Sequence, residues 1–175
     1  PVLKSMRRGI TRRATVELLA KLRERVPGIT IRTTMIAGYP AETNEHFEEL
    51  LSFIKEFKFD RLGVFTFSVE ENTTSFILGD PVPEKEKNRR KKRIMEIQKK
   101  ISHKKNESLT GTVQKVIIDS LEGDYYIGRS TMDAPEVDCE VIIDKEDFEL
   151  APGDFVAVRI YDSAEYDLFG KIERN

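Results

Sequence analysis

The sequence predicts an α/β half followed by an all-β half. The spacing of apolar residues is typical of alternating helices and strands up to residue 107, and it changes to every second residue after Gly111. The charge changes at the same place, since residues 1–106 carry 23 Lys and Arg against 14 Asp and Glu, whereas residues 107–175 carry 6 against 17. We therefore expect two domains with different partners.

Helix and strand segments alternate in the first half. Residues 11–25 have apolar side chains at helical spacing, and residues 29–38 are β-rich and largely apolar, as a buried parallel strand would be. Thr43 is the expected N-cap of a second helix, and residues 61–68 form the second strand. Short connections between these segments indicate βα units in a parallel sheet.

The carboxyl ends of these two strands are the expected ligand site, because ligands of open α/β sheets bind there. This places residues 36–38 and 66–68 at the site. The turn after the first strand contains one glycine, Gly38, and on spacing alone an ordinary βα turn is the more common explanation. The adjacent cations Arg7 and Arg8 could bind a carboxylate or phosphate, although a solvated basic turn is more common.

A long charged helix is expected over residues 84–107, after a loop over residues 69–83. Its apolar stripe is thin, so most of its surface should be solvated. Its basic run at residues 89–93 is more often a solvated face than an RNA-binding surface, because five cations around one helix do not point the same way.

Five short strands punctuated by turn residues follow Gly111. They predict a small closed antiparallel barrel of OB type, since closure removes exposed sheet edges. The expected strands are at residues 113–119, 125–129, 141–143, 154–160 and 166–172.

A loop between two of these strands holds Asp133, Glu136 and Asp138 around a proline. A polar hairpin loop is the simplest interpretation. A docking surface for a cationic partner is the functional alternative, which the acidic surroundings favour.

The composition excludes several kinds of site. The single cysteine, Cys139, allows no internal disulfide and no thiolate cluster, and it fits a reducing compartment, so we expect a cytoplasmic protein. His46 and His103 stand apart from other ligand residues, and no nucleophile and base are paired.

No apolar run is long enough to span a bilayer. The chain begins at Pro1 as if inside an element, which indicates a piece of a longer protein.

Four segments of the sequence are recognisable together: residues 2–9, 36–43, 59–68 and 128–138. They resemble the radical S-adenosylmethionine methylthiotransferases. The resemblance covers essentially the whole chain, in order. Within the family, residues 133–138 and 165–170 are similar to the enzymes that methylthiolate an aspartate of small-subunit ribosomal protein S-twelve, rather than to those that modify a tRNA adenosine.

The resemblance implies a domain organisation. Residues 1–83 would be the C-terminal part of a radical-SAM (βα) barrel, residues 84–107 a linker helix, and residues 108–175 a TRAM domain. An acidic TRAM domain suits a basic ribosomal protein substrate. The alternative, a tRNA methylthiotransferase with an RNA-binding TRAM domain, predicts RNA binding through residues 85–105.

The resemblance also implies cofactor-binding residues. Arg8 would pair with the carboxylate of S-adenosylmethionine, a role suited to a guanidinium. Thr34, Ile36 and Gly38 would flank the methionine and adenosine portions, and Phe67 would lie beside the adenine. The longer protein would hold two 4Fe–4S clusters, with no metal ligand and no catalytic residue in this chain.

The chain departs from the family pattern in ways that affect activity. It lacks the cluster cysteines, so alone it should be inactive. Ala41 replaces a common glycine, Cys139 stands where a glycine is usual, and the loop at residues 71–75 differs. A rival function is that of a binding module whose partial barrel self-associates through open sheet edges.

Overall fold

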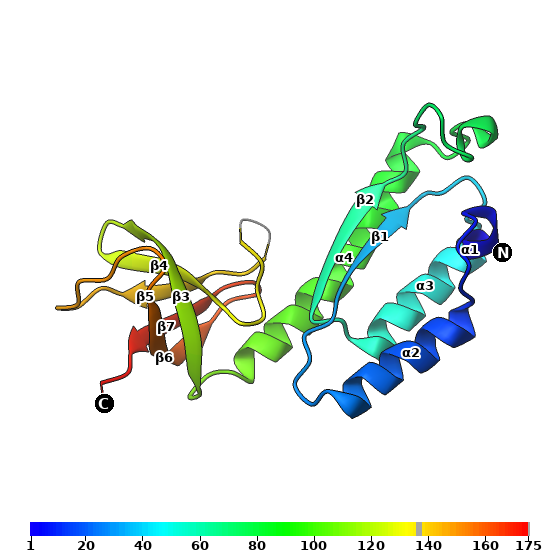
Figure 1. Ribbon diagram of the computed structural model, residues 1–175. Helices are drawn as coiled ribbons and strands as arrows, with labels where there is room; N and C mark the ends of the chain where they lie inside the picture. The colour runs from blue at the N-terminus through cyan, green and yellow to red at the C-terminus, as the bar shows by residue number, and fades with distance from the viewer. Residues whose placement is uncertain (136–137, 175) are drawn as a thin grey trace. The chain divides into compact units, whose positions relative to one another are not determined.

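The computed structural model describes residues 1–135 and 138–174, and the chain divides into two compact units, Pro1–Gln98 and Lys99–Asn175. The boundary lies inside helix α4 (Glu84–Glu107) (Figure 1). The predicted linker over residues 84–107 is therefore one continuous helix, and its residues are divided between the two units.

Unit 1 has the predicted alternation of helices and strands. The short helix α1 (Val2–Ser5) and helix α2 (Arg12–Arg25) precede strand β1 (Arg32–Ala37), helix α3 (Asn44–Phe57) and strand β2 (Arg61–Thr66). The two strands pair in parallel, from Arg32 opposite Arg61 to Ala37 opposite Thr66. This pairing confirms a βα unit and puts both carboxyl ends at one edge of the sheet.

The start of α3 confirms the predicted N-cap. The Thr43 hydroxyl accepts a hydrogen bond from the His46 backbone N–H at 3.3 Å, and the His46 Nδ1 accepts one from the Thr43 backbone N–H at 3.3 Å. This reciprocal capping box satisfies two of the N–H groups that a helix start leaves without partners. Along the helix, Phe47, Leu51 and Ile54 are buried at helical spacing.

One face of the parallel sheet is open. Side chains alternate along β1, so that Thr34 and Ile36 are exposed, whereas Met35 between them is half-buried. Ile36 lies opposite Phe65 on β2, whose side chain is 68% exposed. The open face therefore presents apolar side chains to solvent. The chain then passes through the 3₁₀ turn η1 (Phe76–Leu78) to α4.

Unit 2 is a closed five-stranded barrel with strand order β3-β4-β5-β7-β6 (Figure 1). Inward side chains alternate with outward ones along the strands. Eight inward side chains form the core: Val116, Ile118, Tyr126, Val141, Ile143, Val158, Ile160 and Leu168. The strands are β3 (Val113–Glu122), β4 (Tyr125–Ser130), β5 (Val141–Asp144), β6 (Phe155–Ser163) and β7 (Leu168–Ile172).

The barrel corrects one detail of the prediction, because it is mixed rather than wholly antiparallel. Four neighbouring pairs are antiparallel, whereas β5 and β7 are parallel. The reason is geometric: five strands in a closed ring cannot alternate direction all the way round, so at least one pair must be parallel. The predicted closure itself is confirmed.

No helix among the described residues combines the length and the apolar character needed to cross a membrane.

Candidate cofactor site and docking surface

The two strand ends meet at Gly38 and Phe67. The Phe67 backbone N–H donates to the Ala37 carbonyl at 2.9 Å, which extends the pairing just past the strands. Phe67 is buried, and its ring meets the Tyr39 ring edge-on, with centroids 5.3 Å apart. The Tyr39 hydroxyl in turn lies 3.3 Å from the Ser5 hydroxyl, which connects α1 to this edge of the sheet.

Lys87 of α4 is buried beneath the two strand ends. Its Nζ donates to the Phe67 carbonyl at 2.8 Å and lies 2.5 Å from Asp80 and 3.1 Å from Glu84. The hydrogen bond that Lys87 donates to Asp80 raises the pKa of Lys87 despite its burial, and Glu84 adds to this. A charged lysine therefore supports the carbonyl at the end of β2.

Gly38 packs directly on this lysine. Its φ is +80°, and a Cβ built at this position would lie 2.5 Å from the Lys87 Cγ. Backbone conformation and packing both require glycine here. The single glycine of the turn thus has a structural reason that its spacing in the sequence did not reveal.

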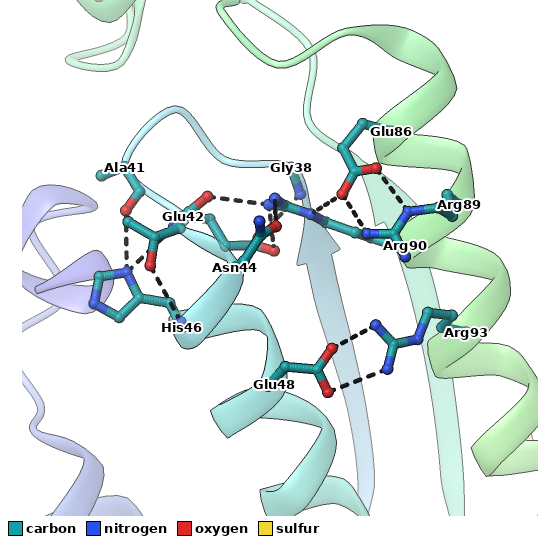
Figure 2. A network of polar contacts seen from close by, with 11 residues as sticks. Gly38, Ala41, Glu42, Asn44, His46, Glu48, Glu86, Arg89, Arg90 and Arg93 are labelled. Atoms are coloured by element: carbon teal, nitrogen blue, oxygen red, sulfur yellow. Dashed lines mark hydrogen bonds and ion pairs between the residues drawn. The ribbon is translucent and has the colours of Figure 1, made fainter.

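Glu42 and Arg90 form a buried ion pair beside the same turn (Figure 2). One Glu42 carboxylate oxygen accepts from the Gly38 backbone N–H at 3.0 Å, and the other accepts from Arg90 Nη1 at 2.9 Å. Arg90 also donates to the Glu42 carbonyl at 3.0 Å and to Asn44 Oδ1 at 3.1 Å. The two side chains are only 5–6% exposed. They hold the turn between β1 and α3 against α4.

The basic run at residues 89–93, predicted to be a solvated face, is partly engaged in ion pairs within unit 1. Glu86 accepts hydrogen bonds from both Arg89 and Arg90, and these, with Arg89 the larger cause, lower the pKa of Glu86 to about 2. Arg93 forms a two-pronged contact with Glu48 (Figure 2). Three of the five cations therefore have acidic partners within unit 1.

The structure brings four of the five predicted cofactor residues close together. Thr34 and Ile36 lie on the open sheet face, and Gly38 and Phe67 lie at the strand ends. Arg8 lies on an exposed turn after α1, where its backbone N–H donates to the Leu3 carbonyl. Within residues 1–135 and 138–174, no hydrogen bond or ion pair joins its guanidinium to the other four.

Sequence reasoning missed the residues that support these strand ends. Lys87 and Arg90 come from a helix far along the chain, and Arg90 is 48 residues from Glu42. The only local signal is Glu42, an acidic residue four positions after a glycine at a strand end. Phe65, which neighbours Ile36 on the open face, was also missed, although strand alternation could have indicated it.

Two of the predicted docking carboxylates shape their own loop. Asp133 is 9% exposed, and its Oδ2 accepts from the Ser130 hydroxyl at 2.6 Å. Asp138 Oδ2 accepts from the Ala134 backbone N–H at 2.9 Å. Glu136 lies outside the described residues. The loop therefore uses carboxylates to satisfy its own polar groups before any partner is considered.

A metal centre is not formed by the described part of the chain. In residues 1–135 and 138–174, no three or more His, Cys, Asp or Glu side chains gather as metal ligands would. Cys139, two residues before β5, is buried, 7% exposed.

Comparison with known proteins gives the family of the chain. Residues 110–172, which include all five barrel strands, match the family model of the TRAM domain. Across 98% of its length, the chain is 50% identical to a protein of Cytophaga hutchinsonii named ribosomal protein uS12 methylthiotransferase RimO. By sequence, the chain belongs to this methylthiotransferase family.

Two further members of the family carry the same name. Proteins of Christiangramia forsetii and Caldanaerobacter subterraneus are each 49% identical over 97% of the chain. The chain spans 38–39% of the length of these three methylthiotransferases. The predicted family and the predicted TRAM domain are thus both confirmed.

Proposed function

We propose that this chain is the C-terminal part of an enzyme that methylthiolates an aspartate of ribosomal protein uS12. Unit 1 contributes one side of the S-adenosylmethionine site, and the TRAM domain docks the protein substrate. The observation that carries the proposal is the 50% identity, because it extends over 98% of the chain and therefore over both units. Such an enzyme acts where ribosomal proteins are made, so we place it in the cytoplasm.

The strand ends and the open sheet face fit the proposed cofactor. Ile36 and Phe65 offer apolar surface for an adenine ring, and Thr34 offers a hydroxyl. The Gly38 backbone N–H donates to Glu42, which fixes the turn beside them. The exposed guanidinium of Arg8 suits the carboxylate of the methionine portion. These residues would bind and orient the cofactor.

The radical and sulfur chemistry itself belongs to S-adenosylmethionine and to the iron–sulfur clusters expected of the family. With one cysteine in 175 residues, the ligands of those clusters must come from the rest of the longer protein. We therefore expect this chain alone to be catalytically inactive.

The charge of the TRAM domain supports a protein substrate rather than RNA. Residues 107–175 carry 17 acidic and 6 basic side chains, which would repel phosphates and attract a basic ribosomal protein. The alternative, RNA binding through residues 85–105, is weakened because Arg89, Arg90 and Arg93 are engaged with acidic partners.

A binding experiment tests the proposal. The 175-residue chain is titrated with purified uS12 and separately with tRNA, over a salt series. We expect binding to uS12 that weakens steeply as salt is raised, and no comparable binding to tRNA. Binding to tRNA alone would instead establish the RNA-modifying alternative.

Matched variants test the acidic loop and the basic helix separately as binding surfaces. Changing Asp133, Glu136 and Asp138 to their amides should weaken uS12 binding, whereas changing the exposed Lys91 and Lys92 to Gln should not. The reverse result would favour the basic helix as the binding surface. Because Asp133 and Asp138 also bond within their loop, Glu136→Gln is tested separately, with circular dichroism to check the fold.

A further inference from the structure

The outer surface of the barrel carries an apolar row across three neighbouring strands. On β4, β5 and β7, every second side chain enters the core, so the residues between them point outward. Ile127 lies opposite Ile142, and Ile142 lies opposite Phe169. All three are half-buried. They form a contiguous apolar surface on the outside of the barrel.

A second row lies beside it and combines aromatic and charged side chains. Tyr125 is opposite Asp144, which is opposite Lys171. Tyr161, at the β-bulge between Ile160 and Asp162, follows the inward Ile160 and is exposed. Its hydroxyl lies 3.4 Å from Asp144 Oδ1, to which it can donate. Tyr125 and Tyr161 are 48% and 47% exposed.

Two exposed phenol rings around a carboxylate suit a cationic side chain. A tyrosine face attracts Lys or Arg through its quadrupole, and the carboxylate adds an ion pair. Partial burial, together with Asp144 and Tyr125, raises the pKa of the Tyr161 phenol, which is consistent with a negative environment. A tyrosine phenol is protonated at neutral pH, so Tyr161 can donate to Asp144.

We propose that these two rows are the surface on which a Lys- or Arg-bearing extended segment of a basic protein docks. A cationic side chain would sit between Tyr125, Tyr161 and Asp144, and its neighbours would cover the apolar row. This rests on the proposed function, since uS12 is the basic partner that function names. Charge complementarity selects this occupant, because residues 107–175 carry 17 acidic side chains against 6 basic ones.

The chain supplies its own competitor for this place. Lys171 Nζ lies 3.5 Å from Asp144 and 3.6 Å from Glu146. A partner's cation would share Asp144 with it. Removal of the Lys171 charge should therefore strengthen docking, a change that damage to the fold would not produce.

The test measures uS12 affinity of the 175-residue chain at one salt concentration by isothermal titration calorimetry. We expect Tyr161→Ala and Asp144→Asn each to weaken binding about tenfold, the size of a partly desolvated cation–π contact or ion pair. Lys171→Gln should tighten binding about threefold. Phe155→Ala is the matched control, because Phe155 is an exposed aromatic residue at the far end of the same strand as Tyr161.

The outcomes separate this inference from the proposed function. Weaker binding by the first two variants, tighter binding by Lys171→Gln and no change in Phe155→Ala support it. If wild-type chain binds uS12 but all four variants bind equally well, docking stands and this surface is wrong. If the wild-type chain does not bind uS12, the proposed function fails together with the surface. The same holds if the wild-type chain binds tRNA and the Tyr161 and Asp144 variants lose that binding.

Discussion

Gly38 combines a conformational and a packing requirement, and the two can be separated. Gly38→Ala should lower the free energy of unfolding by about 3 kcal/mol, because alanine is strained at φ +80° and its Cβ would meet Lys87. Gly28 has φ +77°, but an added Cβ would meet nothing within 4 Å, so Gly28→Ala should cost only about 1 kcal/mol. Urea unfolding of both variants gives the comparison, and equal losses would show that Lys87 gives way.

Glu86 should make stability depend on pH on the acid side. Its pKa is lowered from 4.5 to about 2 in the folded chain, so the stability that it contributes is present above about 4.5. That contribution is lost as the pH falls toward 2, because the unfolded chain takes up the proton first. Glu86→Gln should therefore be less stable than wild type at pH 7, and the difference should shrink between pH 4.5 and the lowest pH at which the chain stays folded.

The control for this titration is Glu24→Gln, at an exposed position on α2. Urea unfolding is followed at several pH values for wild type and both variants. A difference for Glu86→Gln that is the same at every pH would show that the arginines do not depress its pKa.

At the scale of elements, the first half of α4 is a structural part of unit 1. Arg90→Met should destabilise the chain by about 3 kcal/mol, because it leaves the Glu42 carboxylate buried without its cation. Arg93→Met removes a more exposed pair, with Glu48, and should cost about 1 kcal/mol or less. Thermal unfolding by circular dichroism tests this order, which a loosely attached linker helix would not show.

The buried face of α4 shows why the spacing of apolar residues alone was insufficient to predict which of its side chains are buried. The apolar stripe predicted a mostly solvated helix, and Ile94 is indeed fully buried. However, Lys87, Arg90 and Gln98 on the same face are also buried, 2–5% exposed. Their partners are distant in sequence: Arg90 bonds to Glu42, and Gln98 Nε2 donates to the Phe59 carbonyl. Patterns of apolar residues do not register polar side chains that are buried by long-range pairing.

At the scale of the molecule, the open face of the parallel sheet predicts self-association. Parallel sheets are usually covered on both faces, whereas here Ile36 and Phe65 are exposed. We expect a concentration-dependent increase in sedimentation coefficient, which Phe65→Ser should reduce. Ile77→Ser, which removes a side chain that is 85% exposed in η1, is the control and should change nothing. A monomer at all concentrations would contradict the prediction.

The sequence by itself determined the local structure and the family of this protein. Helices, strands and the Thr43 cap depend on neighbouring residues, so spacing and residue type were enough to predict them. The charge change near residue 107 and the segments shared with methylthiotransferases likewise lie in the sequence. Four predicted cofactor residues lie close together because strand ends share one edge of a parallel sheet.

Only the tertiary structure decided which polar groups are internal. Contacts such as Glu42 with Arg90 and Lys87 with Phe67 join residues that are far apart in the chain. The parallel β5–β7 pair follows from closing an odd number of strands, a property of the whole ring rather than of any strand. Burial and charge pairing depend on where the chain returns in space, and local sequence does not specify that.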